Sequence, residues 1–355
     1  MKTVEKILCG FLCLIMIIGC DDKDYTAPVS TLQVVEASLN IQATGGDASV
    51  DFLTDKVVTA ELESDWCLLK EVNKNKILLR VLPNYGYSSR TAQLKVSDGT
   101  ESKNFTINQE GAVLIYEEDD WILRATDATT ELPIKLYGSF DCMVNIPEQA
   151  KSWLSFERDT DGKGGKFIVA ENTTGEIRGA IVRVVSGERQ MAYQVLQSDI
   201  DNYLGTWNGQ FNDGTRVYTP SGVTITKDTD GNYVVSNLFS SLGFNFTIKG
   251  YAVGNEIVFE AGQYLGTDGT NYYGFSVISA DSRFIEDSSG TISLGPVMLK
   301  NGSVAIGFIG IKETDPIGFG LMAYMDEYMD EAYSYKAILD CVLYLSLIHI
   351  SEPTR

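Results

Sequence analysis

The sequence predicts an all-β protein, in which two β-sandwiches precede a small antiparallel β-barrel or sandwich. Short runs of alternating apolar and polar residues recur along the chain, separated by turns of Gly, Asp, Asn and Ser. The chain also carries 33 glycines, 18 tyrosines and 15 phenylalanines, with little helical periodicity. A length of 355 residues predicts two or three domains, and an apolar fraction of 44% suits modules that form cores.

An internal repeat divides residues 31–198 into two copies, 31–111 and 112–198. Each copy contains a tryptophan, then an asparagine, an arginine and a closing glutamine. The two tryptophans, Trp66 and Trp153, are 87 residues apart, and each of the other pairs is 88 residues apart. Those pairs are Asn84 and Asn172, Arg90 and Arg178, and Gln109 and Gln197. An offset this constant indicates a duplicated module.

The residues shared by the two copies are those expected to build a sandwich. Alternation over Ile77–Leu82 predicts a strand with one buried face, and Asp98-Gly99 predicts a hairpin turn between two more strands. We expect both tryptophans to fill the space between the sheets. The two asparagines are expected to hydrogen-bond the backbone of the loop that follows each of them.

Together, these residues and the Val-rich strand between the arginine and the glutamine resemble the BACON domain, the Bacteroidetes-associated carbohydrate-binding often N-terminal module. The first copy is the better match, with Gly45-Gly46 early and Asn108–Gly111 at its end. The second copy lacks the paired glycines and has Trp121 near its first strand. The resemblance implies an immunoglobulin-like sandwich on a surface protein. Many members of the family resemble spacers, so no binding residue is carried over from it.

Residues 1–19 have the pattern of a secretory signal peptide, with two early lysines and an apolar run too short to span a membrane. Ile17–Cys20 resembles a bacterial lipobox, which implies cleavage before Cys20 and lipid attachment to it. Residues 20–30 would then be the lipidated cysteine and an acidic tether, similar to the export signal of Bacteroidetes surface lipoproteins. We expect a lipid-anchored protein of the outer membrane, exposed at the cell surface. An ordinary signal peptide with a chance cysteine is the alternative.

A change of composition at residue 199 begins a third domain, predicted over 199–344. Its opening at Gly205–Trp207, followed by a meander of short strands, is similar to the start of lipocalin-like (calycin) barrels, in which the Trp closes one end. The expected strands are Val223–Lys227, Tyr233–Ser236, Phe244–Lys249, Glu256–Ala261, Tyr272–Ser279, Gly290–Leu294 and Ser303–Ile311. Met322–Tyr335 has Met and Tyr at helical spacing, which predicts a short surface helix or loop. An aromatic, acidic lip on the barrel mouth is the alternative for this segment.

The last eleven residues, 345–355, resemble a translated sequencing-library adapter. This resemblance implies that the natural C-terminus is missing and leaves the third domain open to truncation. The single histidine, His349, lies in this tail and is assigned no role.

Charge and cysteine content exclude several classes of partner. A net charge of −20 predicts that the protein does not bind nucleic acid. Cys67, Cys142 and Cys341 are the cysteines left after residue 20, and their wide spacing is not that of a disulfide framework. The segments Asp159–Gly162 and Asp228–Gly231 resemble the start of a calcium loop, but we interpret them as hairpin turns. We expect no metal site and no cofactor, and the sequence assigns no oligomeric state.

The sequence marks no catalytic group, because no histidine stands outside the tail and no pair of carboxylates is singled out. We therefore expect a non-enzymatic protein that binds extracellular carbohydrate, with the two sandwiches as a stalk. The candidate ligand-binding residues are aromatic, because sugar rings stack on aromatic faces: Trp121, Tyr264, Tyr272, Tyr273, Tyr324 and Tyr328. The alternative is a structural spacer or adhesin whose distal β domain binds a protein or a small apolar ligand.

Overall fold

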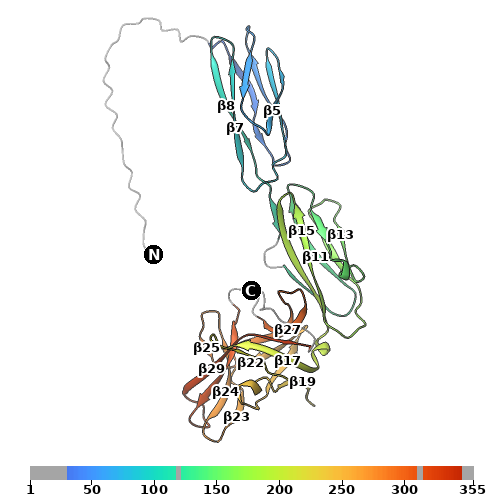
Figure 1. Cartoon of the computed structure of the whole chain (residues 1–355), viewed down its shortest axis with the longest axis vertical. Coiled ribbons are helices and arrows are strands. Elements are labelled where there is room, and N and C mark those ends of the chain that lie inside the picture. The colour runs from blue at the N-terminus through green and yellow to red at the C-terminus, as the bar shows by residue number, and fades with distance from the viewer. Residues whose placement is uncertain (1–29, 117–120, 310–314, 346–355) are drawn as a thin grey trace, which may run out of the picture. The chain divides into compact units, whose positions relative to one another are not determined.

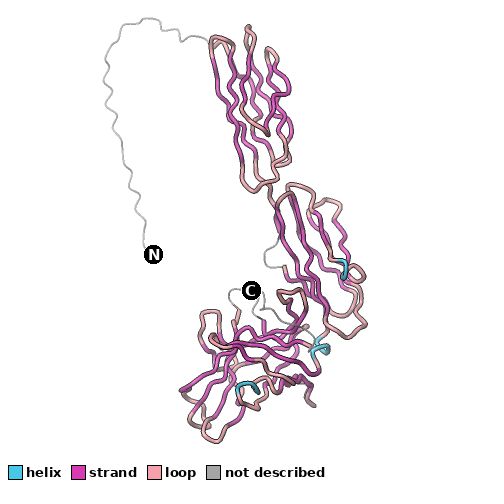
Figure 2. The backbone as a smooth tube through the Cα atoms, in the orientation of Figure 1, coloured by secondary structure: helices cyan, strands magenta, loops and turns pink. Residues whose placement is uncertain are grey.

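The computed structural model describes residues 30–116, 121–309 and 315–345, and most of its regular structure is β-strand (Figures 1 and 2). The all-β prediction is confirmed. The chain divides into two compact units, the first built mainly from Asp47–Val81 and Ala92–Ile107, the second mainly from the residues after Ile107. The described residues include three short 3-10 helices, η2 (Glu148–Ala150), η3 (Ile200–Tyr203) and η4 (Ser240–Leu242). Within the described ranges, no helix has the length and apolarity needed to cross a membrane.

The first copy of the repeat forms two four-stranded sheets, with strand orders β1-β3-β6-β5 and β2-β8-β7-β4. The strands are β1 (Gln33–Ser38), β2 (Asn40–Ile41), β3 (Gly46–Leu53), β4 (Thr59–Leu62), β5 (Cys67–Val72), β6 (Lys76–Val81), β7 (Arg90–Ser97) and β8 (Ser102–Gln109). Ile77, Leu79 and Val81 are buried on one face of β6, as the alternation predicts. The predicted hairpin turn is also present, because the backbone N–H of Asp98 donates to the carbonyl of Glu101 at 3.1 Å.

The second copy repeats this plan with sheets β10-β16-β15-β12 and β13-β14-β11-β9. The strands are β9 (Leu114–Tyr116), β10 (Ile122–Ala125), β11 (Thr130–Gly138), β12 (Met143–Asn145), β13 (Leu154–Arg158), β14 (Gly164–Val169), β15 (Arg178–Ser186) and β16 (Arg189–Gln197). Both copies contain one parallel pair, β2 with β8 and β10 with β16. This shared pairing supports the duplication inferred from the constant offset.

The shared polar residues of the first copy form a hydrogen-bond network at the end of the sandwich. The Nε of Arg90 donates to Oε1 of Gln109 at 2.9 Å, and Nε2 of Gln109 donates to the carbonyl of Leu82 at 2.9 Å. The side-chain amide of Asn84 donates to the carbonyl of Ser88 at 2.9 Å. These bonds satisfy backbone carbonyls that no strand partner reaches, which makes the residues structural.

The second copy reproduces the network at equivalent positions. The Nε of Arg178 donates to Oε1 of Gln197 at 2.8 Å, and Nε2 of Gln197 donates to the carbonyl of Ala170 at 2.9 Å. The side-chain amide of Asn172 donates to the carbonyl of Glu176 at 2.8 Å. The predicted role of both asparagines is therefore confirmed.

The tryptophans of the two copies do not fill the sandwich interiors as predicted. Trp66 and Trp153 are both partly exposed, although Trp153 packs against the core of its copy. The guanidinium of Arg178 lies 4.7 Å from the centroid of the Trp153 ring, in a cation–π contact. Phe167 and Tyr193 fill the second interior instead, with ring centroids 5.7 Å apart. Each tryptophan stands immediately before a strand, Trp66 before β5 and Trp153 before β13, and is only partly buried there.

Eight strands of the C-terminal region form a closed antiparallel barrel in the order β17-β19-β20-β21-β22-β26-β27-β29, and β29 pairs back with β17 (Figure 1). Their bounds are β17 (Gly205–Asn212), β19 (Val223–Lys227), β20 (Tyr233–Ser236), β21 (Ile248–Val253), β22 (Glu256–Glu260), β26 (Thr291–Met298), β27 (Val304–Ile309) and β29 (Ala332–Tyr344). The short strand β18 (Val217–Tyr218) pairs with β17. Of the two predicted architectures, the barrel is the one that forms.

The long strand β29 also carries a second set of strands away from the barrel. Its first part pairs with β28 (Gly318–Tyr324), β28 pairs with β24 (Tyr272–Ile278), and β24 pairs with β23 (Tyr264–Thr267) and with β25 (Phe284–Ile285). Asp340 has a φ of 51° near the point where β29 changes from β28 to β17. This extension, β23-β24-β28-β29, carries most of the tyrosines predicted to bind ligand.

The C-terminal domain has one large buried cluster of apolar and aromatic side chains. Trp207 is 6% exposed, and its indole N–H donates to the carbonyl of Tyr203 at 2.9 Å. Phe275 of β24 and Phe319 of β28 face the same cluster, with ring centroids 5.4 Å apart. These aromatic side chains belong to one buried cluster, which joins the barrel strands to β24 and β28.

Two predicted elements of the C-terminal domain were wrong. Phe244–Lys249 is not a strand over most of its length, because Phe244 and Phe246 lie in the loop before β21 and pack on the Tyr273 ring at 4.8 and 5.0 Å. Met322–Tyr335 is neither a helix nor simply a loop, because β28 and β29 enclose a turn there. The first residues of this segment form part of β28, because β28 pairs with β24, and this long-range pairing overrides the local helical spacing.

Candidate functional site

The six aromatic residues predicted to bind ligand differ widely in exposure. Tyr264 and Tyr328 are 54% and 75% exposed, and Tyr272 is partly exposed. Tyr273 and Tyr324 are buried, at 7% and 4%. The sixth, Trp121, precedes β10 of the second sandwich, and its carbonyl accepts the backbone N–H of Gln194 at 2.8 Å. The structure therefore groups the five tyrosines in the C-terminal domain and leaves the tryptophan in a different one.

Strand register places several tyrosines on one face of the extension. Tyr272 lies opposite Tyr324 in the β24–β28 pair, and Tyr264 lies opposite Gly274 in the β23–β24 pair. Tyr335 lies opposite Met322 in the β28–β29 pair. Residues directly opposite each other point to the same side of a sheet, as do alternate residues of one strand. Tyr264, Tyr272, Tyr324 and Tyr335 therefore share one face, which we call the tyrosine face.

The tyrosine face combines exposed rings with anchored ones. The rings of Tyr264 and Tyr272 lie side by side with centroids 6.3 Å apart. Tyr335 is 60% exposed and packs on Phe284 at 4.6 Å. The hydroxyl of buried Tyr324 donates to Glu286, and burial together with this hydrogen bond raises the pKa of Tyr324. The anchored ring supports a surface on which the other rings stay accessible.

Tyr273 points to the opposite side of the extension and has a structural contact. Its hydroxyl donates to Oδ2 of Asp268 at 2.8 Å in the β23–β24 turn. The backbone N–H groups of Asn271 and Thr270 also donate to the Asp268 carboxylate, each at 2.8 Å. These hydrogen bonds, led by the one from Asn271, lower the pKa of Asp268 to about 2. The contacts indicate that Tyr273 fixes the turn rather than contacting a ligand.

A polar cleft of 440 Å³ lies on the outer side of β21 and β22, and sequence reasoning missed it. It is lined by Asn232, Lys249, Gly250, Tyr251, Glu260, Ala261, Gly262, Gln263 and Ser288. Lys249 and Tyr251 are exposed, Glu260 is partly exposed, and the intervening Gly250 is buried. The alternation of β21 could have shown that two of these residues point outward. Their meeting with three distant segments could not be read from the sequence.

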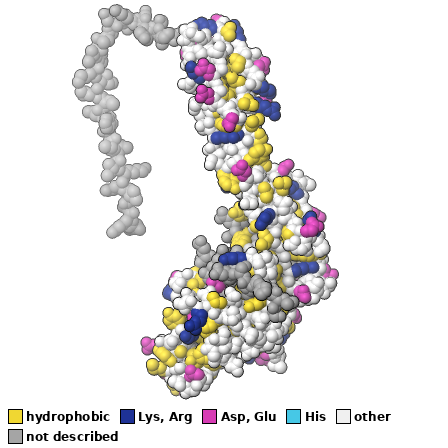
Figure 3. Space-filling view, in the orientation of Figure 1, with side chains coloured by type: hydrophobic (Ala, Val, Ile, Leu, Met, Phe, Trp, Pro, Cys, Tyr) yellow, Lys and Arg dark blue, Asp and Glu magenta, His cyan; other side chains and the backbone are white. Residues whose placement is uncertain are grey.

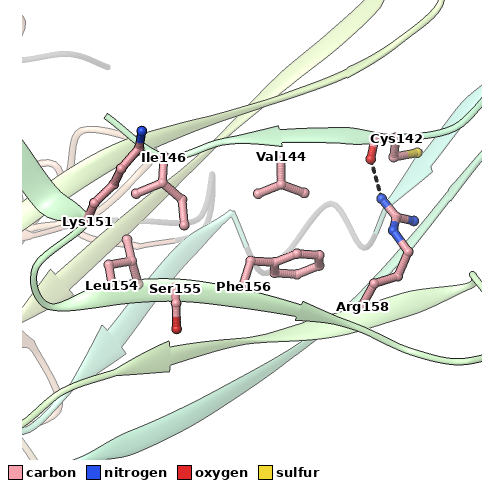
Figure 4. Close-up of a pocket in the computed structure, with 8 residues that line it drawn as sticks. All are labelled: Cys142, Val144, Ile146, Lys151, Leu154, Ser155, Phe156 and Arg158. Carbon is pink, nitrogen blue, oxygen red and sulfur yellow. Dashed lines mark hydrogen bonds between the residues drawn. The ribbon is translucent and has the colours of Figure 1, made fainter. Parts of the chain in front are cut away.

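A second hollow, of 520 Å³, lies in the second sandwich between the edge strands β12 and β13 (Figure 4). Val144, Leu154 and Phe156 give it an apolar lining, while Ser155 points away from it. At one end Arg158 donates a hydrogen bond to the carbonyl of Cys142. This hollow, which we call the edge groove, offers apolar contact and few groups for hydrogen-bonding a polar ligand.

The two calcium-like segments are turns, as predicted. In the first, the N–H of Gly162 donates to the carbonyl of Asp159 at 3.0 Å. In the second, Oδ1 of Asp228 accepts the backbone N–H groups of Asp230 and Asn232 at 3.0 and 2.9 Å. Within the described ranges, no group of His, Cys, Asp and Glu is arranged to hold a metal ion.

Charged side chains of both signs are interspersed over the face shown in Figure 3, without one single-sign patch among the described residues in view. Several carboxyl groups have clearly shifted pKa values, and each of these shifts is downward. They belong to Asp98, Glu101, Asp201, Asp213, Asp228, Asp268, Asp281 and Asp287. Hydrogen bonds from hydroxyl, ammonium or backbone groups are the main cause, so these carboxylates are held in the ionised form.

Comparison with known protein families finds a match for part of the first sandwich. Residues 56–110 match the BACON family. The family is described as "BACON: Putative binding domain, N-terminal", and the matched BACON segment contains strands β4 to β8 of the first sandwich. The match relates this sandwich to a class of binding modules, while BACON character in the second copy stays a prediction. A search of curated proteins gave no match.

Three of the solved structures that resemble parts of this chain are distant from it in sequence. A protein from Bacteroides thetaiotaomicron is 16% identical, with 26% of this chain and 98% of that chain covered and a TM-score of 0.22. An endo-fucoidan hydrolase from glycoside hydrolase family 107 is 13% identical over 51% of this chain, with a TM-score of 0.24, and the match spans 30% of the hydrolase. Titin domains z1z2, in complex with telethonin, are 11% identical over 47% of this chain and 92% of theirs, with a TM-score of 0.23. These likenesses assign no function to the chain.

Proposed function

We propose that this protein is a non-enzymatic carbohydrate-binding protein of the bacterial cell surface. In this proposal the lipid attached to Cys20, which lies outside the described residues, holds the chain at the outer membrane. The two sandwiches act as a stalk, and the C-terminal domain binds glycan. The BACON match supports a binding role, and the C-terminal surface supports the choice of carbohydrate.

The observation that carries the proposal is the tyrosine face. Tyr264 and Tyr272 present neighbouring rings, one of them 54% exposed, and Tyr335 adds a third exposed ring on the same side. Pyranose rings have apolar C–H faces that pack on aromatic side chains, while their hydroxyls need polar partners. Exposed tyrosines supply both an apolar ring and a hydroxyl group, so they suit a surface that contacts a sugar chain from one side.

Eight described carboxyl groups are held in the ionised form, which makes these eight poor candidates for a catalytic acid. A glycosidase needs one carboxylic acid that stays protonated near neutral pH, which requires a raised pKa. The resolved shifts among the described carboxyl groups go the other way, as for Asp268 with a pKa of about 2. Ionised carboxylates accept hydrogen bonds from sugar hydroxyls but do not donate a proton to a leaving group.

The test is a glycan array with the full chain and three tyrosine variants. Tyr264→Ala and Tyr272→Ala should each weaken binding by about tenfold, since loss of one aromatic contact costs about 1.4 kcal/mol. Tyr137→Ala is the matched control, because Tyr137 is 48% exposed on β11 of the second sandwich. Circular dichroism would confirm that each variant is folded.

Two outcomes would contradict the proposal. Absence of array binding by the folded full chain would refute glycan binding at the tyrosine face and favour the spacer or adhesin. Binding that Tyr264→Ala and Tyr272→Ala leave unchanged would move the glycan site away from the tyrosine face.

A further inference from the structure

The β21–β22 cleft is held open by a loop with several fixed contacts. Nε2 of Gln263 donates to the carbonyls of Lys249 and Glu260 at 2.9 and 2.8 Å, and Oε1 of Gln263 accepts the backbone N–H of Lys249 at 2.9 Å. The N–H groups of Ala261 and Gly262 donate to the carbonyls of Gly290 and Phe275, both at 2.8 Å. The wall of the cleft is therefore joined to three other segments before any ligand arrives.

Close packing behind this wall requires a glycine. Gly262 has a φ of 83°, and a Cβ atom there would lie 3.0 Å from the carbonyl oxygen of Glu286. The segment that it contacts continues to Ser288, which forms part of the cleft. Gly262 thus allows the loop that supplies Ser288 to approach β22 closely.

The groups facing the cleft include one oriented ring and one available carboxylate oxygen. The hydroxyl of Tyr251 donates to Oε1 of Glu260 at 2.9 Å, which fixes one edge of a ring that is 41% exposed. This hydrogen bond raises the pKa of Tyr251, because loss of its proton would set two negative charges side by side. Among the described residues, no hydrogen bond is made to Oε2 of Glu260, so this oxygen can accept one from a ligand.

The other polar groups that line the cleft can donate hydrogen bonds to a ligand, whereas Oε2 of Glu260 can accept one. The ammonium group of Lys249 lies 3.4 Å from Oδ2 of Asp228, which pairs its charge while leaving the side chain 60% exposed. The amide of Asn232 and the hydroxyl of Ser288 add groups of either hydrogen-bonding polarity. A ligand that offers several hydroxyls and no net charge matches this set, because Glu260 and the net charge of −20 both repel anions.

We propose that the β21–β22 cleft is a second ligand site, which binds one neutral sugar ring and shares no lining residue with the tyrosine face. Its volume of 440 Å³ falls within the range of about 300–1,000 Å³ typical of small-molecule sites. The sugar ring lies against Tyr251, and its hydroxyls bond to Glu260 and Lys249. This proposal extends the proposed function. It gives the C-terminal domain a site for one sugar unit in addition to the tyrosine face, which would contact a glycan chain.

The test measures binding of free glucose, galactose, mannose and xylose to the full chain by saturation-transfer NMR at millimolar concentrations. At least one of them should bind, and Tyr251→Ala and Glu260→Gln should each weaken that binding by about tenfold or more. Tyr251→Phe keeps the ring and loses only the hydrogen bond to Glu260, so it should bind more tightly than Tyr251→Ala. Tyr137→Ala, in the second sandwich, should bind like the unaltered protein.

The proposal that the cleft binds sugar would be refuted if none of the four sugars bound, or if Tyr251→Ala and Glu260→Gln left the binding unchanged. A glycan array with the same preparations separates this failure from failure of the tyrosine face. Array binding that depends on Tyr264, without binding of any free sugar, refutes the cleft and leaves the proposed function standing. Free-sugar binding that depends on Tyr251, without array binding, supports the cleft and refutes the tyrosine face.

Discussion

Replacing Gln197 by leucine tests whether the repeated polar network stabilises the sandwiches. Gln197 is fully buried at the end of β16. Its Nε2 donates to the carbonyls of Thr126 and Ala170, both at 2.9 Å, and its Oε1 accepts from Nε of Arg178 at 2.8 Å. Leucine is similar in size but makes none of these bonds, so the substitution removes three hydrogen bonds, although the Ala170 carbonyl still accepts one from Nη2 of Arg178 at 2.8 Å.

The expected loss of stability depends on whether each lost hydrogen bond involves a charged group. A neutral hydrogen bond contributes about 1 kcal/mol to stability, and one to a charged group contributes about 1.5–3 kcal/mol. Arg178 is only partly buried, so water can replace part of its lost bond. We expect Gln197→Leu to lower the stability of the second sandwich by about 3–4 kcal/mol, a large share of the ~5–15 kcal/mol typical of a domain.

The assay is hydrogen exchange followed by mass spectrometry on the full chain, because a chain of several domains does not unfold in one step. The free energy of opening is read from the amides of β15 and β16. Gln194→Leu is the matched control on the same strand, since Gln194 is partly exposed and should change stability by less than about 0.5 kcal/mol. Equal, small effects of Gln197→Leu and Gln194→Leu would refute the reasoning.

Three further predictions concern other parts of the chain. Arg124→Met should change the melting temperature little or raise it. Burial disfavours the charged guanidinium and lowers the pKa of Arg124, while its partner Glu256, at 3.8 Å, stays in contact with water. A large fall in the melting temperature measured by calorimetry would contradict this. The pKa of Asp268 is lowered from 3.8 to about 2 on folding, so its stabilising effect should be complete above about pH 4 and be lost as the pH falls through about 2; carboxyl NMR titration checks the value, and Asp268→Asn should remove that part of the pH dependence. Cys67 and Cys341 are buried, at 1% and 2% exposed, so a thiol reagent should label them only after denaturation, and rapid labelling of the folded chain would contradict their burial.

Short-range features of the fold were predictable because they depend on neighbouring residues. Period-two alternation gave Val223–Lys227 and Tyr233–Ser236 with the bounds of β19 and β20. Turn residues gave the hairpin at Asp98-Gly99, and the constant offset gave the duplicated network of Arg and Gln. Each of these signals is contained in a few residues or in a comparison of the chain with itself.

The candidate site was predictable only in part. Aromatic content pointed to Tyr264 and Tyr272 in the C-terminal domain, but it did not separate them from buried Tyr273, which neighbours Tyr272 in sequence. Tyr272 is the partly exposed first residue of β24 and every later residue of that strand is buried, so exposure depends on how the strand packs, which composition alone does not show. The same limit hid Glu260, because one charged residue among many carries no positional signal.

The sequence by itself determined the strand content, the turns and the duplication, because these follow from local backbone preferences and from self-similarity. Only the tertiary structure decided that the third domain closes into a barrel, since closure pairs Asn208 with Tyr344, far away along the chain. It also decided that Tyr251, Glu260 and Ser288 line one cleft. Pairing between distant strands depends on the packing of the whole domain, which no local pattern of residues specifies.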